Sequence, residues 1–169
     1  IESETGDEML YAFQIHMLRK EWSRTAQARA LAKIINNSKE EIGRKQEKEL
    51  FDIIQEKTGY NETSLRDLFR VLKYVDKNEK VLDEIDDPKS NIKFSHLVQL
   101  EASFVEQIER MFPDIIKKYG VETIRSKLLD KVRIDVISST REPMEKLLPL
   151  FIHSKTTEQK EYLKKLIID

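Results

Sequence analysis

Residues 61–73 concentrate hydrogen-bonding side chains at spacings that one helix could present together. Arg66 is the strongest candidate for contact with a DNA base. One guanidinium can form hydrogen bonds to O6 and N7 of a guanine at once, which discriminates between bases by roughly 1–3 kcal/mol. Glu62 could accept a hydrogen bond from cytosine N4, although repulsion between its carboxylate and the DNA phosphates would weaken binding. Arg70 and Lys73 lie further along and are placed for phosphate contacts. The candidate base-contacting residues are Asn61, Glu62, Thr63, Ser64, Arg66 and Asp67.

The same stretch also fits a solvated helix face that binds nothing. Glu62 and Arg66 are four residues apart, and Asp67 and Arg70 are three apart. These are the spacings at which opposite charges pair along a helix. In such pairs the candidate side chains would bind one another rather than DNA, so the sequence leaves both interpretations open.

A second set of candidates stands where another helix is expected to begin. Ser23 is a suitable N-cap, and Arg24, Thr25 and Gln27 follow it in the first turn. The backbone N–H groups at such an end can bind a phosphate, but an ordinary capped surface helix explains these residues equally well. The polar stretch 39–48 could be a DNA-contacting arm, although its alternating charges are more typical of an exposed, partly helical insertion.

Residues 50–74 supply the two helices that must position the first set. Gly59 predicts the end of the first helix, because a left-handed C′ position suits glycine, and Asn61 predicts the N-cap of the second. So short a connection indicates a helix-turn-helix, although a helical hairpin in any α-bundle has the same pattern. The apolar residues at helical spacing are Leu50, Ile53 and Ile54 before the turn and Leu65, Leu68, Phe69 and Leu72 after it.

Helical periodicity continues along the rest of the chain. Ser95 predicts one N-cap, residues 156–159 resemble a capping box, and Pro113 fits the first turn of a helix that Gly120 would close. The expected helices cover residues 8–19, 23–36, 75–85, 95–111, 113–118, 121–132, 141–151 and 156–168, with a loop over 86–91.

The helix after Ser23 is expected to end near Asn36, because the run of two asparagines and a serine that starts there favours turns and caps. Trp22 is expected to be a core anchor at the junction with the preceding helix. The residues expected to be buried along this helix are Ala28, Leu31, Ala32 and Ile35.

Composition favours an all-α fold. Charged residues make up 36% of the 169 residues, and there are only four glycines and four prolines, which is typical of long solvated helices. We predict a multi-helix domain containing the helix-turn-helix over residues 1–111, followed by a C-terminal helical extension over residues 112–169. Because the chain begins at Ile1 among acidic residues, we expect a piece of a longer protein.

Composition also narrows the function classes. The absence of cysteine excludes disulfides and cysteine-based zinc sites or nucleophiles, and the three histidines lack the spacing of a zinc helix. We therefore expect no catalytic residue, no metal and no enzyme. No apolar run approaches the roughly 20 residues that span a membrane. A net charge of −1 argues against wholesale coating of phosphates, so any basic face must be assembled by folding.

Several short segments, in order, resemble the ParB family of chromosome and plasmid partition proteins. Residues 16–23 (HMLRKEWS) and 27–31 (QARAL) resemble the family's Glu-Asn-x-x-Arg box and the Ala-Arg-Ala helix that follows it. Residues 68–73 (LFRVLK) resemble the Leu-Leu-Arg-Leu-Leu-Lys run that ends its helix-turn-helix. Residues 94–97 (FSHL) loosely match its Leu-Ser-x-x-His segment, and residues 139–142 (STRE) are similar to its Ser-Val-Arg-Glu.

The resemblance implies a cytoplasmic, nucleoid-associated protein that binds double-stranded DNA sequence-specifically as a homodimer and works with a ParA-type ATPase in DNA segregation. A transcriptional or nucleoid-associated regulator could use the same module, and a helical protein-interaction scaffold would need no DNA. Full-length relatives bind CTP, but the family's Gly-Glu-Arg-Arg phosphate box is not in this chain. His16 replaces its usual Asn, and Val98-Gln99 replace its Ala-Arg. We therefore expect no cofactor in this chain.

Overall fold

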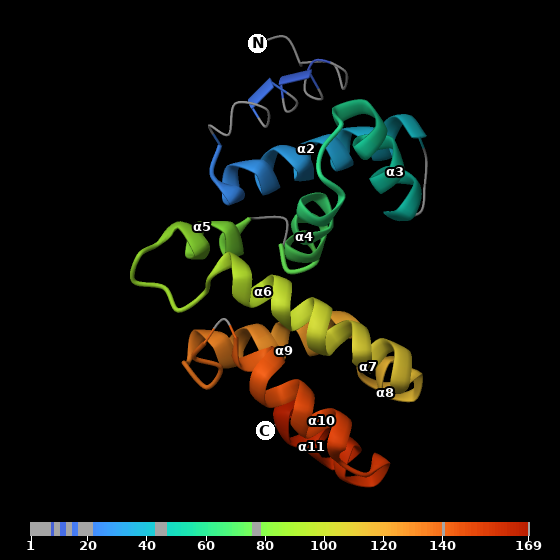
Figure 1. Ribbon diagram of the computed structural model, residues 1–169, viewed down its shortest axis with the longest axis vertical. Coiled ribbons are helices and arrows are strands. Elements are labelled where there is room, and N and C mark those ends of the chain that lie inside the picture. Colours follow the sequence, from blue (N-terminus) through green and yellow to red (C-terminus); the bar gives the residue numbers. More distant parts are fainter. Residues whose placement is uncertain are drawn as a thin grey trace. The chain divides into compact units, whose positions relative to one another are not determined.

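The structure is a computed structural model that describes Glu8 and residues 11–12, 15–16, 22–42, 47–75, 79–139 and 141–168. All regular structure within these ranges is helical, which confirms the all-α prediction (Figure 1). The chain forms two compact units, Ile1–Leu82 and Asp83–Asp169. The division into functional domains at residue 111 stays a prediction, and the expected helix over residues 8–19 lies largely outside the described residues.

The first unit contains α2 (Arg24–Ile42), α3 (Glu47–Thr58) and α4 (Glu62–Leu72), and the boundary between the units lies within α5 (Lys80–Asp86). The N-cap predicted for α2 is confirmed, because the Ser23 hydroxyl accepts a hydrogen bond from the Ala26 N–H at 3.2 Å. Its predicted end near Asn36 is wrong, since the helix continues to Ile42. Asparagine and serine are weak helix formers rather than breakers, and packing readily overrides that preference.

The core of the first unit forms where α2 and α3 pack against α4. Leu31 and Ile34 of α2 are buried, whereas Ile35, which was expected there, is half-buried. The Phe51 ring of α3 lies 5.5 Å from the Phe69 ring of α4, measured between centroids. The buried residues of α4 are Leu65, Leu68, Phe69 and Val71; Leu72, expected in that set, is half-buried.

The second unit opens with one long helix of three consecutive segments. These are α6 (Phe94–Leu100), the π-helical turn η1 (Glu101–Val105) and α7 (Glu106–Met111). The predicted N-cap at Ser95 is wrong, because the helix already starts at Phe94 and Lys93 occupies the cap position without a side-chain bond. Pro113 begins α8 (Pro113–Tyr119), and Gly120, with φ of 78°, separates it from α9 (Val121–Arg133), as expected.

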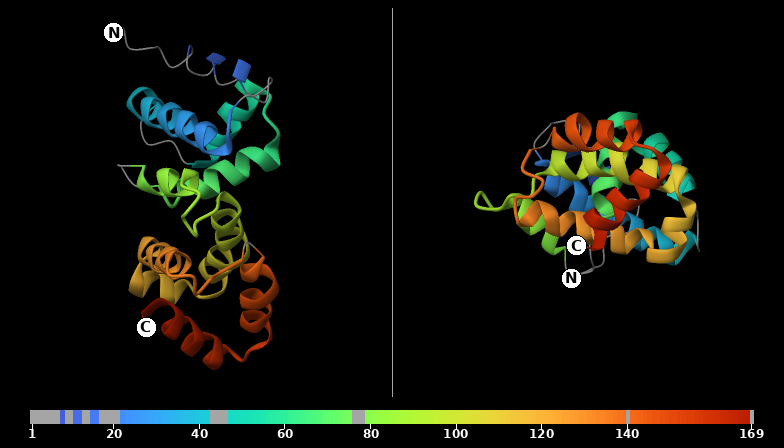
Figure 2. Two further views of the ribbon diagram at one scale, coloured as in Figure 1. Left: turned by 90° about the vertical axis from the view of Figure 1, so that its left-hand side faces the viewer. Right: turned by 90° about the horizontal axis from the view of Figure 1, so that it is seen from below.

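Two more helical segments complete the second unit. The π-helical turn η2 (Pro143–Leu147) leads directly into α10 (Leu148–His153). A short turn joins α10 to α11 (Thr156–Ile168), and the two helices contact each other (Figures 1 and 2). The capping interaction at the start of α11 differs from the expected box. The carboxylate of Glu158 accepts from the N–H of Lys155 at 3.2 Å, and Thr156 is already the first helical residue.

Aromatic rings and one buried ion pair hold the second unit together. Phe151 packs edge-on against Phe104 and Phe112, with centroids 5.5 Å apart in each case. Arg125 of α9 and Glu101 of η1 are 6% and 0% exposed, and two hydrogen bonds of 2.6 and 3.0 Å join their charged groups. Burial disfavours the charged guanidinium, but the bonds and charge of Glu101 outweigh burial and raise the pKa of Arg125.

Candidate nucleic-acid interface

The turn between α3 and α4 has the geometry that its residues predicted. Gly59 adopts φ of 63° and donates its N–H to the Gln55 carbonyl at 2.8 Å, which ends α3. Added side-chain bulk at Gly59 would meet nothing within 4 Å, so backbone conformation rather than space favours glycine. The Asn61 side-chain oxygen accepts the Ser64 N–H at 3.1 Å and caps α4.

The first turns of α4 present a polar surface on the side away from the core. Asn61, Glu62, Thr63 and Arg66 are exposed. The remaining predicted contact residues of this helix and its end are half-buried, and they are Ser64, Asp67, Arg70 and Lys73. The predicted base-contacting set therefore lies on one helix, with its most exposed members in the first two turns.

The charged side chains of this surface are paired. The Arg66 guanidinium lies 2.6 Å from the Glu62 carboxylate and 5.6 Å from the centre of the Phe51 ring, and Arg70 lies 3.5 Å from Asp67. Both pairs expected for a solvated helix face are thus present. Arg66 and Glu62 are 53% and 58% exposed, and such exposed helix pairs stabilise by only about 0.3–0.5 kcal/mol. A guanine contact worth roughly 1–3 kcal/mol would outweigh that pairing.

The start of α2 differs from a simple surface phosphate site. Thr25 and Gln27 are buried, and the Thr25 hydroxyl lies 2.9 Å from that of Ser23. The Thr25 side chain therefore faces protein rather than solvent. Arg24 is half-exposed and is the member of this set whose side chain reaches the surface.

Tyr60, which the sequence did not single out, connects α2 to the turn before α4. Its hydroxyl donates to Gln27 Oε1 at 3.1 Å and accepts from Arg24 Nη1 at 3.2 Å. Burial raises the pKa of the Tyr60 phenol, against the opposing effects of Arg24 and Ser64. Its aromatic ring in a polar turn was the only signal in the sequence, because partners 33 and 36 residues away are set by tertiary packing.

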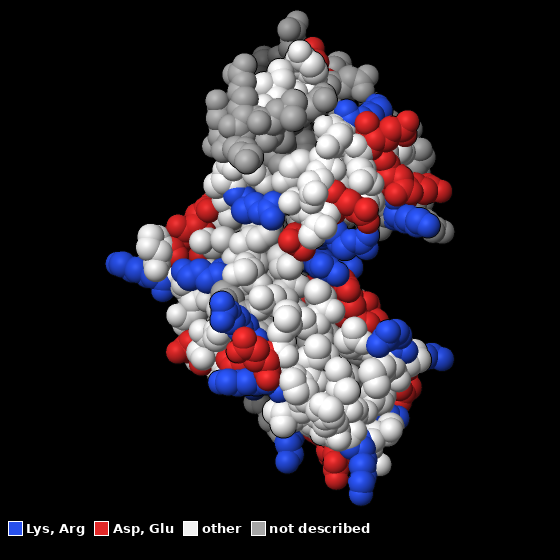
Figure 3. Space-filling model, viewed as in Figure 1, with Lys and Arg blue, Asp and Glu red and all other residues white. Residues whose placement is uncertain are grey.

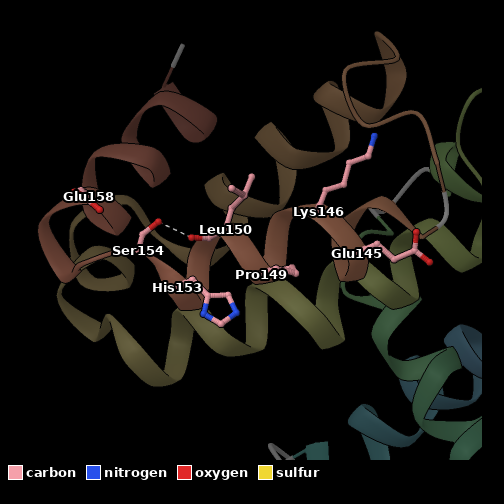
Figure 4. A pocket seen from close by; sticks show the side chains of 7 residues that line it. All are labelled: Glu145, Lys146, Pro149, Leu150, His153, Ser154 and Glu158. Carbon is pink, nitrogen blue, oxygen red and sulfur yellow. Dashed lines mark hydrogen bonds between the residues drawn. The ribbon is translucent and has the colours of Figure 1, made fainter.

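On the face of the molecule that Figure 3 shows, positive and negative side chains are intermixed. An open groove of about 580 Å³ lies along η2 and α10, and its lining side chains come from both segments and from α11 (Figure 4). It contains none of the predicted contact residues, and its lining residues are Glu145, Lys146, Pro149, Leu150, His153, Ser154 and Glu158. Within the described ranges, no three His, Asp or Glu side chains form a group that could hold a metal ion.

Comparisons with known proteins found no match to this chain. No family model, curated protein or solved structure matches it. Among the helices of the described segments, none is both long and apolar enough to cross a membrane.

Proposed function

We propose that this chain binds double-stranded DNA sequence-specifically and that α4 enters the major groove with its N-terminal end first. The observation that carries the proposal is the α3–turn–α4 unit. Gly59 and Asn61 form the short turn between the two helices, and α2 packs against α4. In a helix-turn-helix, the early residues of the second helix contact base edges. The first two turns of α4 are the part whose polar side chains are most exposed.

The predicted contacts have separate roles. Arg66 would contact guanine, exchanging the Glu62 carboxylate for O6 and N7. Arg70 and Lys73, one turn or more further along, would contact phosphates. Because the chain has a net charge of −1, attraction to the phosphate backbone would be confined to this helix and its flanks.

Within this proposal the chain is a binding protein of the ParB-like partition type. It would act as a homodimer at a pseudo-palindromic site whose two halves lie about one duplex turn apart, and it would cooperate with a ParA-type ATPase. The support is the resemblance of the short segments in residues 16–31, 68–73, 94–97 and 139–142. A nucleoid-associated or transcriptional regulator would use the same DNA chemistry.

A competing proposal is a helical interaction scaffold without a DNA role, and the Glu62–Arg66 and Asp67–Arg70 pairs favour it. Selection of bound sequences from a random duplex pool separates the two. Under the DNA proposal, the pool yields an enriched motif, and affinity for it falls steeply with rising salt as counterions are released. A pool that stays unenriched, with no binding at low salt, supports the scaffold.

Replacement of Arg66 and Arg70 by alanine tests the placement of α4. Affinity for the selected duplex should fall about a hundredfold or more, because a base contact and a phosphate contact are lost together. The matched control is Lys127→Ala/Lys155→Ala, which removes two positive charges from exposed positions of the second unit. Both variants should keep the wild-type circular dichroism spectrum. Unchanged affinity of the arginine variant would refute the placement.

A further inference from the structure

Arg24 and Tyr60 form a hydrogen-bonded group that ties the start of α2 to the turn before α4. Arg24 Nη1 lies 3.2 Å from the Tyr60 hydroxyl and 3.4 Å from Gln27 Oε1. The Tyr60 hydroxyl in turn lies 3.1 Å from Gln27 Oε1, so the three polar groups contact one another in a closed triangle.

The other members of this group are anchored in the protein. Gln27 is buried, and its side-chain amide donates to the Trp22 carbonyl at 3.0 Å. The Tyr60 N–H donates to the Thr58 hydroxyl at 3.3 Å, and that hydroxyl donates to the Ile54 carbonyl at 2.6 Å. Only Arg24 carries a charge, and it is half-exposed, as is Tyr60. The network therefore restricts a cationic side chain beside the N-terminal end of α4.

We infer that Tyr60 is a positioning residue that holds the Arg24 guanidinium for contact with a DNA phosphate next to the groove occupied by α4. This inference rests on the proposed DNA-binding function. Arg24 supplies the positive charge, and Tyr60 fixes the orientation of the guanidinium. A guanidinium already held in place loses less conformational freedom when it binds a phosphate. The contact fixes the register of α4 without reading sequence, as phosphate contacts do.

The test is a double-variant cycle with Tyr60→Phe and Arg24→Ala, using a fluorescent duplex selected from the random pool and a second duplex of scrambled sequence. Arg24→Ala should weaken binding to both duplexes by a similar factor and reduce the slope of log affinity against log salt by about one. Tyr60→Phe should weaken both about three- to tenfold, because it removes one hydroxyl contact to a charged group. Its salt slope should stay closer to the wild-type value, since the charge is retained.

The decisive comparison is Tyr60→Phe in the Arg24→Ala background, where it should change affinity less than twofold. A full additional loss there would overturn the inference, and so would wild-type affinity of the single Tyr60→Phe variant. A tyrosine with only a structural role would lower the melting temperature without this dependence on Arg24. Tyr119→Phe, in the second unit, is the matched control for loss of a phenol hydroxyl.

Two further results complete the design. If Tyr60→Phe does not fold, Arg24→Lys is tested in its place, because lysine keeps the charge but lacks the guanidinium whose Nη1 bonds Tyr60 and Gln27. A loss of affinity comparable with that of Arg24→Ala supports positioning, and wild-type affinity overturns it. Failure of the wild-type protein to bind any duplex at low salt would refute the proposed function itself, and the inference with it. Normal wild-type binding with additive variants would refute the inference alone.

Discussion

Removing one member of the buried pair of Arg125 and Glu101 should strongly destabilise the second unit. Replacing Arg125 by methionine keeps a side chain of similar length but removes the guanidinium that bonds Glu101, which is 0% exposed. Breaking a buried ion pair in this way costs roughly 3–5 kcal/mol, because an uncompensated charge remains in the interior. That cost is comparable with the whole stability of a small domain.

The assay is urea unfolding followed by circular dichroism and by tryptophan fluorescence. With an m value of about 1.5–2 kcal/mol/M, the midpoint for the second unit should fall by about 2 M. The single tryptophan, Trp22, lies in the first unit, so fluorescence should report a smaller change than circular dichroism. Arg133→Met is the matched control. Its partners Glu84 and Asp130 lie 2.8 and 2.9 Å away at a partly exposed site, and its loss should cost only about 0–1 kcal/mol.

A double variant, Arg125→Met with Glu101→Leu, separates loss of the pair from loss of packing. Replacing both members of a buried pair by apolar residues of similar size is often neutral or stabilising. We therefore expect the double variant to recover most of the stability that Arg125→Met loses. Equal midpoints for Arg125→Met and Arg133→Met, or a double variant less stable than the single one, would refute the assignment of this pair as a buried contact.

Two further predictions concern the first helix turn of α4 and the interior of α6. Asn61→Ala should lower the free energy of unfolding by about 1 kcal/mol, because the Ser64 N–H loses its acceptor, and Asn61→Ser should restore most of it in the same urea titration. Burial lowers the pKa of His96, helped by Lys93 and opposed by the Ser139 and Asn91 backbone and by Glu142. Because the ordinary pKa of histidine is about 6.5, His96 binds a proton more readily in the unfolded chain than in the folded one, so the free energy of unfolding should fall as pH drops from 7.5 to about 5.5. His96→Leu should flatten that pH dependence, and an unchanged slope would contradict the prediction.

Local signals were sufficient to predict the turn between α3 and α4. Gly59 and Asn61 act through bonds to residues no more than four positions away, so their roles as helix end and cap could be predicted from the sequence. Local signals were misleading in two places, because the preferences of asparagine and serine for helix ends are weak. The asparagines near position 36 did not end α2, and Ser95 did not cap α6.

The sequence by itself therefore determined the all-α class, the α3–turn–α4 unit and the polar side of α4, because helix periodicity and capping depend on near neighbours. Only the tertiary structure decided which distant groups meet. Packing of the helices buries Thr25 and brings together Arg24 and Tyr60, which are 36 residues apart, and Glu101 and Arg125, which are 24 residues apart. Such contacts depend on how whole helices pack, and no spacing along the chain specifies them.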